Sequence, residues 1–206
     1  MKQFILIAST LFCTLSMAQN KFETAMKQGL QKFEAAKTAD DFNTLSATFE
    51  RIADAEKTQW LPYYYASLTQ VLKCFQTEGD AKDKICDKAQ DLLSKAEAIE
   101  KNSEIECVKQ MISVNRMMVD PMTRWQQYGP MGAQAIAVAK KLDPTNPRPY
   151  YLEGQTVLNT PPSFGGGMEN AKPLFLKAKE LFESFKPTSE LHPNWGKQQL
   201  DEILKK

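Results

Sequence analysis

Large apolar residues recur at steps of three and four positions along most of the chain, which is the spacing that places side chains on one face of an α-helix. The first two stripes consist of Phe22, Met26, Leu30 and Phe33, and of Phe42, Leu45, Phe49 and Ile52. No stretch has a convincing strand pattern, and the aromatic run from Tyr63 to Tyr65 lies within a helical frame. The pattern therefore predicts an all-α protein.

Turn and capping signals divide these stripes into separate helices. Thr38, followed three positions later by Asp41, is a helix-capping signal. Asp120-Pro121 ends a helix, so residues 121–130 are expected to form a long connection. The predicted helices pair as four hairpins over 21–56, 60–100, 103–142 and 147–186, and a short terminal helix follows them.

A spaced triplet of small, large and small residues recurs in three of the four predicted hairpins. The triplets are Ala89/Leu93/Ala96, Gly132/Ile136/Ala139 and Ala171/Phe175/Ala178. Small residues at these positions allow neighbouring helices to approach closely, and such recurrence is typical of stacked helical repeats. The alternative is a helical bundle with no true repeat.

The segment IAVAKKLDPTNPRPYYLEGQ resembles the end of one tetratricopeptide repeat and the start of the next. Ala139 and Pro144 match the closing residues of that repeat, Gly154 matches its glycine, and Tyr150 takes the place of its usual tryptophan. The resemblance covers residues 19–206 and implies a right-handed α-solenoid of about four helical hairpins with a C-terminal capping helix. It also implies protein or peptide binding. More loosely, the TPPSFGGG insertion and the terminal HPNWG are similar to those of small exported bacterial proteins of this class, which have no established activity.

The first 18 residues have the pattern of a cleaved export signal. Lys2 is the charged residue, Phe4 to Met17 is mostly apolar, and Ser16-Met17-Ala18 fits the cleavage rule. The apolar stretch is too short to cross a bilayer, which needs about 20 residues. We therefore expect a mature chain that begins at Gln19 and is periplasmic or secreted. Attachment of a lipid to Cys13 is a weaker alternative.

The charge of the chain is balanced, with a formal net charge of +1. No basic stripe emerges along the sequence, which argues against nucleic acid and anionic membrane surfaces as partners. No second apolar run is long enough to suggest an integral membrane span.

The sequence shows no pattern of catalytic or metal-binding residues. His192 is the single histidine, and no nucleophile or metal motif accompanies it, so a structural role is expected. Asp80, Asp83 and Asp87 lack the glycine and the closing glutamate of a calcium loop. We therefore predict a protein that is not an enzyme and that has no cofactor and no metal site.

Three cysteines remain after the export signal, and two of them are predicted to lie at facing helix ends. Cys74 is near the end of the third helix and Cys86 near the start of the fourth, so these two form the disulfide if there is one. Cys107 is expected roughly 20 Å from Cys86, too far for a bridge.

The helical phase assigns the tyrosines to two faces. Tyr63 and Tyr150 are expected in the core, whereas Tyr64 and Tyr151, one residue on, are rotated by about 100° toward the concave surface. By resemblance to the groove positions of the family, the predicted binding surface consists of Tyr64, Arg148, Tyr151, Gln155 and Asn159, with Phe164 at the rim. The alternative is a groove filled by the chain's own terminal helix.

Two functional interpretations remain open. The first is a non-enzymatic protein that binds a protein or peptide partner in the cell envelope. The second is a small-molecule-binding component associated with an envelope transporter, with the TPPSFGGG loop at the mouth of its ligand site.

Overall fold

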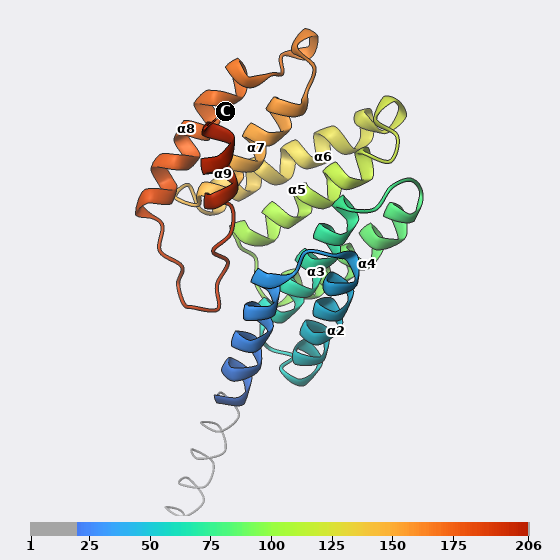
Figure 1. Ribbon diagram of the computed structural model, residues 1–206, viewed down its shortest axis with the longest axis vertical. Helices are drawn as coiled ribbons and strands as arrows, with labels where there is room; N and C mark the ends of the chain where they lie inside the picture. Colours follow the sequence, from blue (N-terminus) through green and yellow to red (C-terminus); the bar gives the residue numbers. More distant parts are fainter. Residues whose placement is uncertain (1–19, 206) are drawn as a thin grey trace, which may run out of the picture.

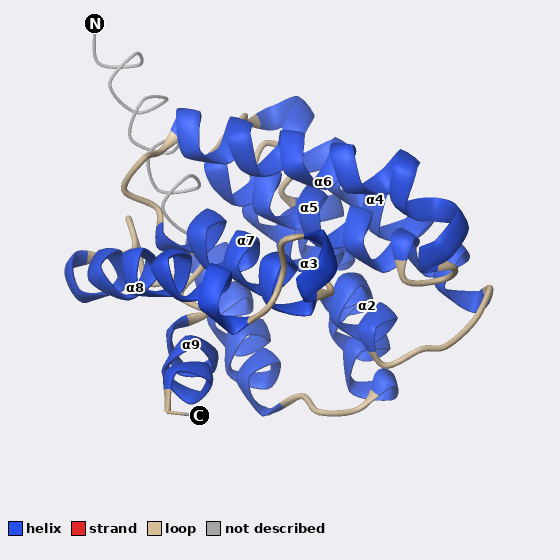
Figure 2. Ribbon diagram, turned by 90° about the horizontal axis from the view of Figure 1, so that it is seen from above, coloured by secondary structure: helices blue, strands red, loops and turns tan. Residues whose placement is uncertain are grey.

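The computed structural model describes residues 20–205, which form helices and connecting loops with no strand in that range (Figures 1 and 2). A helix over residues 20–35 is followed by α2 (Ala39–Ala55), α3 (Trp60–Phe75), α4 (Ala81–Ile99), α5 (Ser103–Met117), α6 (Pro121–Leu142), α7 (Pro147–Asn159), the short 3-10 helix η1 (Pro162–Phe164), α8 (Met168–Ser184) and α9 (Lys197–Leu204). The all-α prediction is confirmed. The predicted export signal over residues 1–18 lies outside the described residues.

The helices stack in the order of the sequence. α3 packs on α4, α5 on α6, and α7 on α8, which are three of the predicted hairpins. The first helices of successive hairpins also touch, α3 against α5 and α5 against α7, so the hairpins form a continuous helical-repeat-like array (Figure 1). α9 packs on α8 at the C-terminal end of the array.

In two hairpins, a glycine of the first helix packs directly against a phenylalanine ring of the second helix. A Cβ atom on Gly154 of α7 would lie 2.6 Å from two ring carbons of Phe175 on α8. A Cβ atom on Gly29 would lie 2.8 Å from the Phe49 ring on α2. In the α3–α4 hairpin the corresponding close contact is polar, because the Ser67 hydroxyl donates a 2.7 Å hydrogen bond to the carbonyl of Ala89.

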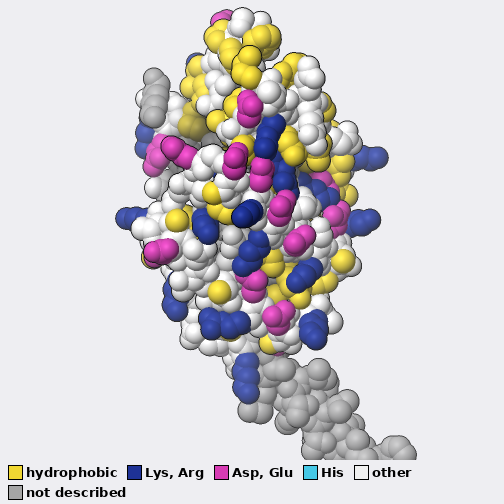
Figure 3. All heavy atoms as spheres, turned by 90° about the vertical axis from the view of Figure 1, so that its right-hand side faces the viewer, with side chains coloured by type: hydrophobic (Ala, Val, Ile, Leu, Met, Phe, Trp, Pro, Cys, Tyr) yellow, Lys and Arg dark blue, Asp and Glu magenta, His cyan; other side chains and the backbone are white. Residues whose placement is uncertain are grey.

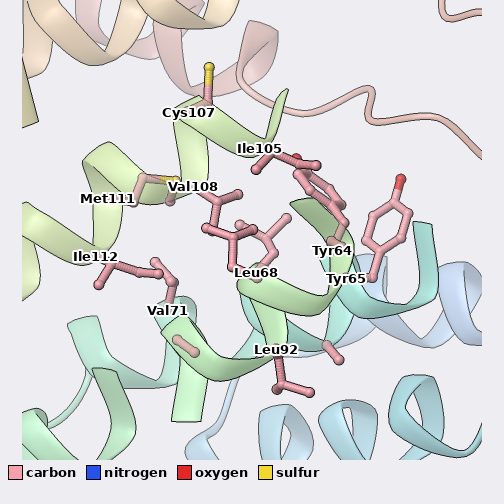
Figure 4. Close-up of a cluster of buried hydrophobic side chains, with 14 of the residues drawn as sticks. Tyr64, Tyr65, Leu68, Val71, Leu92, Ile105, Cys107, Val108, Met111 and Ile112 are labelled. Atoms are coloured by element: carbon pink, nitrogen blue, oxygen red, sulfur yellow. The ribbon is translucent and has the colours of Figure 1, made fainter. Parts of the chain in front are cut away.

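The predicted small–large–small triplets face the interior. All nine of their residues are buried in the helix-packing core, including the central Leu93, Ile136 and Phe175. Figure 4 shows the middle of this core, where Leu68 and Val71 of α3 lie close to Val108 of α5. Burial of these apolar surfaces is the main source of stability for the array.

The segment over residues 121–130 differs from its prediction as a long connection. It is the first part of α6, which begins at Pro121 and contains Pro130 within the helix. Proline is tolerated at the first helical position, and the Asp120 carboxylate caps the end by accepting a hydrogen bond from the Thr123 amide. The prediction failed because Asp-Pro can begin a helix as well as end one, and Arg124 in the first turns of α6 pairs with Asp83 of α4 at 2.7 Å.

Cys74 and Cys86 lie next to each other, as expected from the predicted pairing of the third and fourth helices. The sulfur atoms of Cys74 and Cys86 are 3.3 Å apart, as thiols, in the buried contact between α3 and α4. Cys107 is buried on α5, and in Figure 4 its side chain points away from the α3 residues. The disulfide itself stays a prediction.

Candidate functional site

The C-terminal segment, residues 185–196, crosses the end of the helix array and places its side chains against α3 and α7. Arg148 of α7 is completely buried beneath it. The Arg148 guanidinium lies 4.7 Å from the centre of the Phe185 ring and 5.2 Å from that of Trp195. It also pairs with the Glu104 carboxylate of α5 at 2.9 Å and donates a hydrogen bond to the carbonyl of Pro193.

Two tyrosines of α3 hold the same segment. The Trp195 indole N–H donates a 2.9 Å hydrogen bond to the Tyr64 hydroxyl, and the Tyr65 hydroxyl donates a 3.0 Å hydrogen bond to the carbonyl of Leu191. Burial raises the pKa of both phenols well above its usual value. The segment is therefore fixed to the helices by hydrogen bonds in addition to apolar packing.

These contacts correct the predicted binding surface. Tyr64, Arg148 and Tyr151 are buried, so their side chains do not line an open groove. The C-terminal segment covers them, with Trp195 against Tyr64 and Arg148 and with Gly196 next to Tyr151. The alternative from the sequence was closure by the terminal helix, and these contacts come from the segment that precedes that helix. Periodicity indicates which residues share a helix face, but it does not indicate what packs on that face.

The remaining predicted site residues differ in how much of each side chain is exposed to solvent. Gln155 is half-buried and donates a 2.7 Å hydrogen bond to the hydroxyl of Tyr151, while Asn159 is exposed. Phe164, on the loop before α8, is 81% exposed. Tyr63 is buried as predicted, but Tyr150 is only half-buried, with the Lys140 ammonium 4.4 Å from its ring centre.

A cavity of about 510 Å³ lies where the C-terminal segment meets the ends of α3, α4, α5 and α6. Its apolar wall includes Trp60, Leu142, Phe185, Pro187 and Pro193. Its polar wall includes Glu100, Lys101, Glu104, Asp143, Asn146, Lys186 and His192. The volume falls within the roughly 300–1,000 Å³ that is typical of small-ligand sites.

His192 contributes an imidazole ring to this cavity. Its Nδ1 is 2.8 Å from the Ser189 hydroxyl oxygen, and its ring lies edge to face with Trp60, with 5.7 Å between centres. Burial lowers the pKa of His192, which favours the neutral ring at physiological pH. The sequence indicated a structural role because no motif accompanies this histidine, and the residues that surround it come from distant parts of the chain.

Glu104 lines the cavity and forms a buried polar cluster with Arg148, which is fully buried and does not itself line the cavity. Asn146 donates a 2.8 Å hydrogen bond to Oε1 of Glu104, which also accepts from Arg148. Glu104 Oε2 and Arg148 Nε have no hydrogen-bond partner among the described residues. Burial raises the pKa of Glu104, although Arg148 and Asn146 act in the opposite direction. Because Glu104 Oε2 and Arg148 Nε are both buried, the cluster contains two polar atoms that are unpaired among the described residues.

A second feature is an exposed apolar surface at the beginning of α6. We define this α6 apolar surface as Met118, Met122 and Trp125, all at least half exposed. Figure 3 shows hydrophobic atoms gathered toward the end of the molecule that holds the α5–α6 corner and the α7–α8 loop. Exposed apolar groups of this kind mark interaction sites more often than single exposed side chains do.

Neither a metal cluster nor a membrane span emerges from the described part of the chain. Over residues 20–205, no group of three His, Cys, Asp or Glu side chains is placed to hold a metal ion. In the same range no helix is both long and apolar enough to cross a membrane.

Comparison with known proteins identifies a relative by structure. No protein-family model matches the chain, and no curated protein sequence does. Among solved structures, the HusA haemophore from Porphyromonas gingivalis matches with a TM-score of 0.81 and 33% sequence identity. The match covers 89% of this chain and 90% of HusA. The chain belongs to the family of the HusA haemophore.

Proposed function

We propose that this protein is an exported, non-enzymatic carrier that binds haem or a closely related tetrapyrrole. The observation that carries the proposal is the likeness to a haemophore over about nine-tenths of both chains. It favours the small-molecule interpretation of the sequence over the peptide-groove interpretation. The burial of Arg148 and Tyr151 under the C-terminal segment supports the same choice, because that segment leaves no open groove over them.

The cavity next to the C-terminal segment fits the chemistry of such a ligand. Haem is a flat apolar ring with carboxylate side chains and an iron atom that takes axial ligands. Trp60 and Phe185 would supply aromatic surface for the ring, Lys101 and Lys186 would supply ammonium groups for the carboxylates, and the His192 imidazole would add a polar group beside them. The cavity volume of about 510 Å³ is of the size that a drug-sized ligand needs.

Two further features of the proposal rest on the sequence. Export is supported by the signal pattern of residues 1–18. The Ser189 hydroxyl and Nδ1 of His192 are 2.8 Å apart, but no carboxylate among residues 20–205 hydrogen-bonds to the ring and no nucleophile motif accompanies the pair, which supports a carrier without enzymatic chemistry. The stacked hairpins and the close contact of Gly154 with Phe175 support a tetratricopeptide-like origin for the array.

A titration of the purified exported protein with haemin tests the proposal. We expect a saturable red shift of the main absorption band at one haem per chain. We also expect a rise in melting temperature, because a ligand at about 100 times its Kd stabilises the folded state by about 2.7 kcal/mol. Haemin that causes neither a saturable spectral change nor thermal stabilisation would show that the chain does not share this ligand.

Protein binding is a second candidate function, favoured by the α6 apolar surface. Met122 is 85% exposed and Trp125 is more than half exposed on the same helix. Such a surface suits a receptor that takes the cargo from its carrier. A partner protein from the envelope fraction should bind the wild-type protein but not the double variant Met122→Ser, Trp125→Ser. Equal binding of the partner by both proteins argues against this surface.

A further inference from the structure

The α6 apolar surface belongs to a larger part of the array that carries very few charges. Residues 117–135, at the α5–α6 corner, contain two charged side chains, Asp120 and Arg124, and residues 157–168, around the α7–α8 loop, contain none. In the whole chain, 25% of the residues are charged. We call these two segments the apolar end of the protein. A surface that only faces water has no need to be so poor in charge, which indicates contact with an apolar partner.

The two segments lie at the same end of the array because α5 and α7 run side by side in the same direction. The side-chain amide of Asn146, just before α7, donates a 3.0 Å hydrogen bond to the hydroxyl of Ser103 at the start of α5. Further along both helices, the side-chain amide of Gln110 donates a 3.1 Å hydrogen bond to the hydroxyl of Thr156. The last turns of α5 and α7 therefore reach the same end, where Figure 3 shows hydrophobic atoms gathered.

The two charged groups of the apolar end are already used within the protein. The Arg124 guanidinium pairs with both carboxylate oxygens of Asp83 on α4, at 2.7 and 2.8 Å. The Asp120 carboxylate accepts a 3.4 Å hydrogen bond from the Thr123 amide and caps α6. The apolar end therefore has little charge with which to attract an ionic partner, and its affinity must come from apolar side chains.

The apolar side chains of this end project outward. Phe164 on the α7–α8 loop and Met122 on α6 are each more than four-fifths exposed, and Trp125 is more than half exposed. None of the three lines the cavity next to the C-terminal segment. A protein partner would need a recess shaped for each projection, whereas fluid lipid adapts to any shape. Tryptophan is also enriched where proteins meet the bilayer interface.

The α7–α8 loop pairs most of its backbone groups internally, although it is not helical. It contains two prolines, which have no N–H. Of the six N–H groups over residues 160–167, five donate to carbonyls of residues 157–162, at 2.9 to 3.2 Å. The Asn170 side chain donates to the carbonyls of Gly165 and Gly166. Because unpaired backbone groups are costly in lipid, a loop paired in this way can leave water at a small cost.

We propose that the apolar end inserts into the interfacial region of a lipid bilayer of little net charge, with Phe164 from one segment and Met122 and Trp125 from the other. The contact does not rest on the proposed haem-binding function. Membrane binding of this kind grows with buried apolar area and with attraction to anionic lipids, and the apolar end supplies the first of these. The neighbouring α3–α4 turn carries Glu78 and Asp80 and stays in water.

Co-sedimentation of the purified exported protein with phosphatidylcholine vesicles tests the proposal. Because insertion does not depend on charge, the bound fraction should change by less than about twofold between about 0.05 and 0.5 M salt. Adding phosphatidylglycerol to the vesicles should not increase it. Brominated phosphatidylcholine should quench tryptophan fluorescence in the wild type but not in Trp125→Phe, because Trp60 is buried and the Trp195 indole is bonded to Tyr64.

Two variants remove the inserted side chains from the two segments separately. Phe164→Ser and the double variant Met122→Ser, Trp125→Ser should each weaken vesicle binding by at least about 10-fold, because each loses a large apolar group. Phe164 also separates this proposal from the receptor contact above, which involves the α6 apolar surface alone.

Phe75→Ser is a matched control for these variants. Phe75 is also a half-exposed aromatic residue at the end of a helix, but it adjoins the charged α3–α4 turn. This variant should bind vesicles within about twofold of the wild type. All the replaced side chains are about half exposed or more, so the melting temperatures should stay close to that of the wild type.

Three results would overturn the inference. One is a wild-type protein that does not bind the vesicles; a partner protein or a second copy of the chain that binds without lipid, and is lost with Phe164→Ser, would then be assigned to the apolar end. Another is vesicle binding that needs phosphatidylglycerol and disappears at high salt, which would mean that charge drives it. The third is an equal effect of Phe75→Ser and Phe164→Ser, including no effect of either.

Discussion

Replacing Gly154 with alanine should destabilise the protein, although alanine favours helices by about 1 kcal/mol relative to glycine. The new Cβ atom would lie 2.6 Å from two carbons of the Phe175 ring and 3.2 Å from a third. Ordinary carbon–carbon contacts begin near 3.4 Å, so the ring or the helix must move by most of an ångström. Phe175 is 0% exposed and is packed on all sides, so its ring has no open space to enter.

The overpacking cost outweighs the gain in helix propensity. Inserting a methyl group into a well-packed core typically costs about 1–3 kcal/mol, and a clash with a buried aromatic ring belongs near the top of that range. After subtracting about 1 kcal/mol for helix propensity, the net loss is about 2 kcal/mol. For a chain of this length the melting temperature should fall by roughly 4–8 °C.

Gly132 provides a matched control, because it is also a buried helical glycine. A Cβ atom there would lie 3.6 Å from the Ser113 Cβ, an ordinary contact. Gly132→Ala should therefore raise the stability by about 0.5–1 kcal/mol through helix propensity alone. Thermal and urea melts followed by circular dichroism measure both variants, and the two changes should have opposite signs.

A double-mutant cycle identifies the ring as the cause. Phe175→Leu alone should be destabilising because it leaves space in the core. Combined with Gly154→Ala, it should cost less than the sum of the two single changes by at least about 1 kcal/mol. A Gly154→Ala protein that is as stable as the wild type, or a cycle with additive energies, would refute this account of the α7–α8 contact.

Two further predictions concern the core. In exported protein, peptide mapping under non-reducing conditions should find Cys74 bonded to Cys86, and reduction should lower the stability by about 3 kcal/mol; a bridge to any other cysteine contradicts the helix pairing. In an alkaline titration followed by near-ultraviolet absorption, Tyr64, Tyr65 and Tyr151 should not ionise near pH 10, because burial raises all three pKa values, that of Tyr151 to about 12. Stability from these raised pKa values is fully present below the unfolded-state pKa near 10 and is lost as the pH rises from there through the folded-state values, so these phenols should ionise together with unfolding. The contrary outcome is ionisation of all six tyrosines near pH 10 in a protein that keeps its helical signal.

Much of the helix array follows from local sequence. The three- and four-residue steps of apolar side chains determine which faces are buried, and the small residues of the triplets, such as Ala89 and Ala178, determine where helices approach closely. The Thr38 capping box forms as its spacing predicts, with the Asp41 carboxylate accepting from the Thr38 amide at 2.9 Å. These features depend on residues within a few positions of one another, which is the range over which periodicity carries information.

Most of the contacts that form the candidate site could not be predicted from the sequence. The resemblance to tetratricopeptide repeats predicts that Arg148 lies on the inner face of α7. It did not indicate that Phe185 and Trp195 enclose the Arg148 guanidinium. The C-terminal segment has no helical period of its own between α8 and α9, so nothing in its local pattern shows where it runs.

The sequence by itself determined the class of fold, the hairpin pairing and the proximity of Cys74 to Cys86. Only the tertiary structure decided that the inner face is closed, that α6 continues through Pro130, and that His192 lies in a cavity beside Trp60, more than 130 positions earlier in the chain. The physical reason is that these outcomes come from contacts between distant segments. Their free energy depends on how well surfaces fit after the helices have stacked, and a single sequence read along its length does not contain that information.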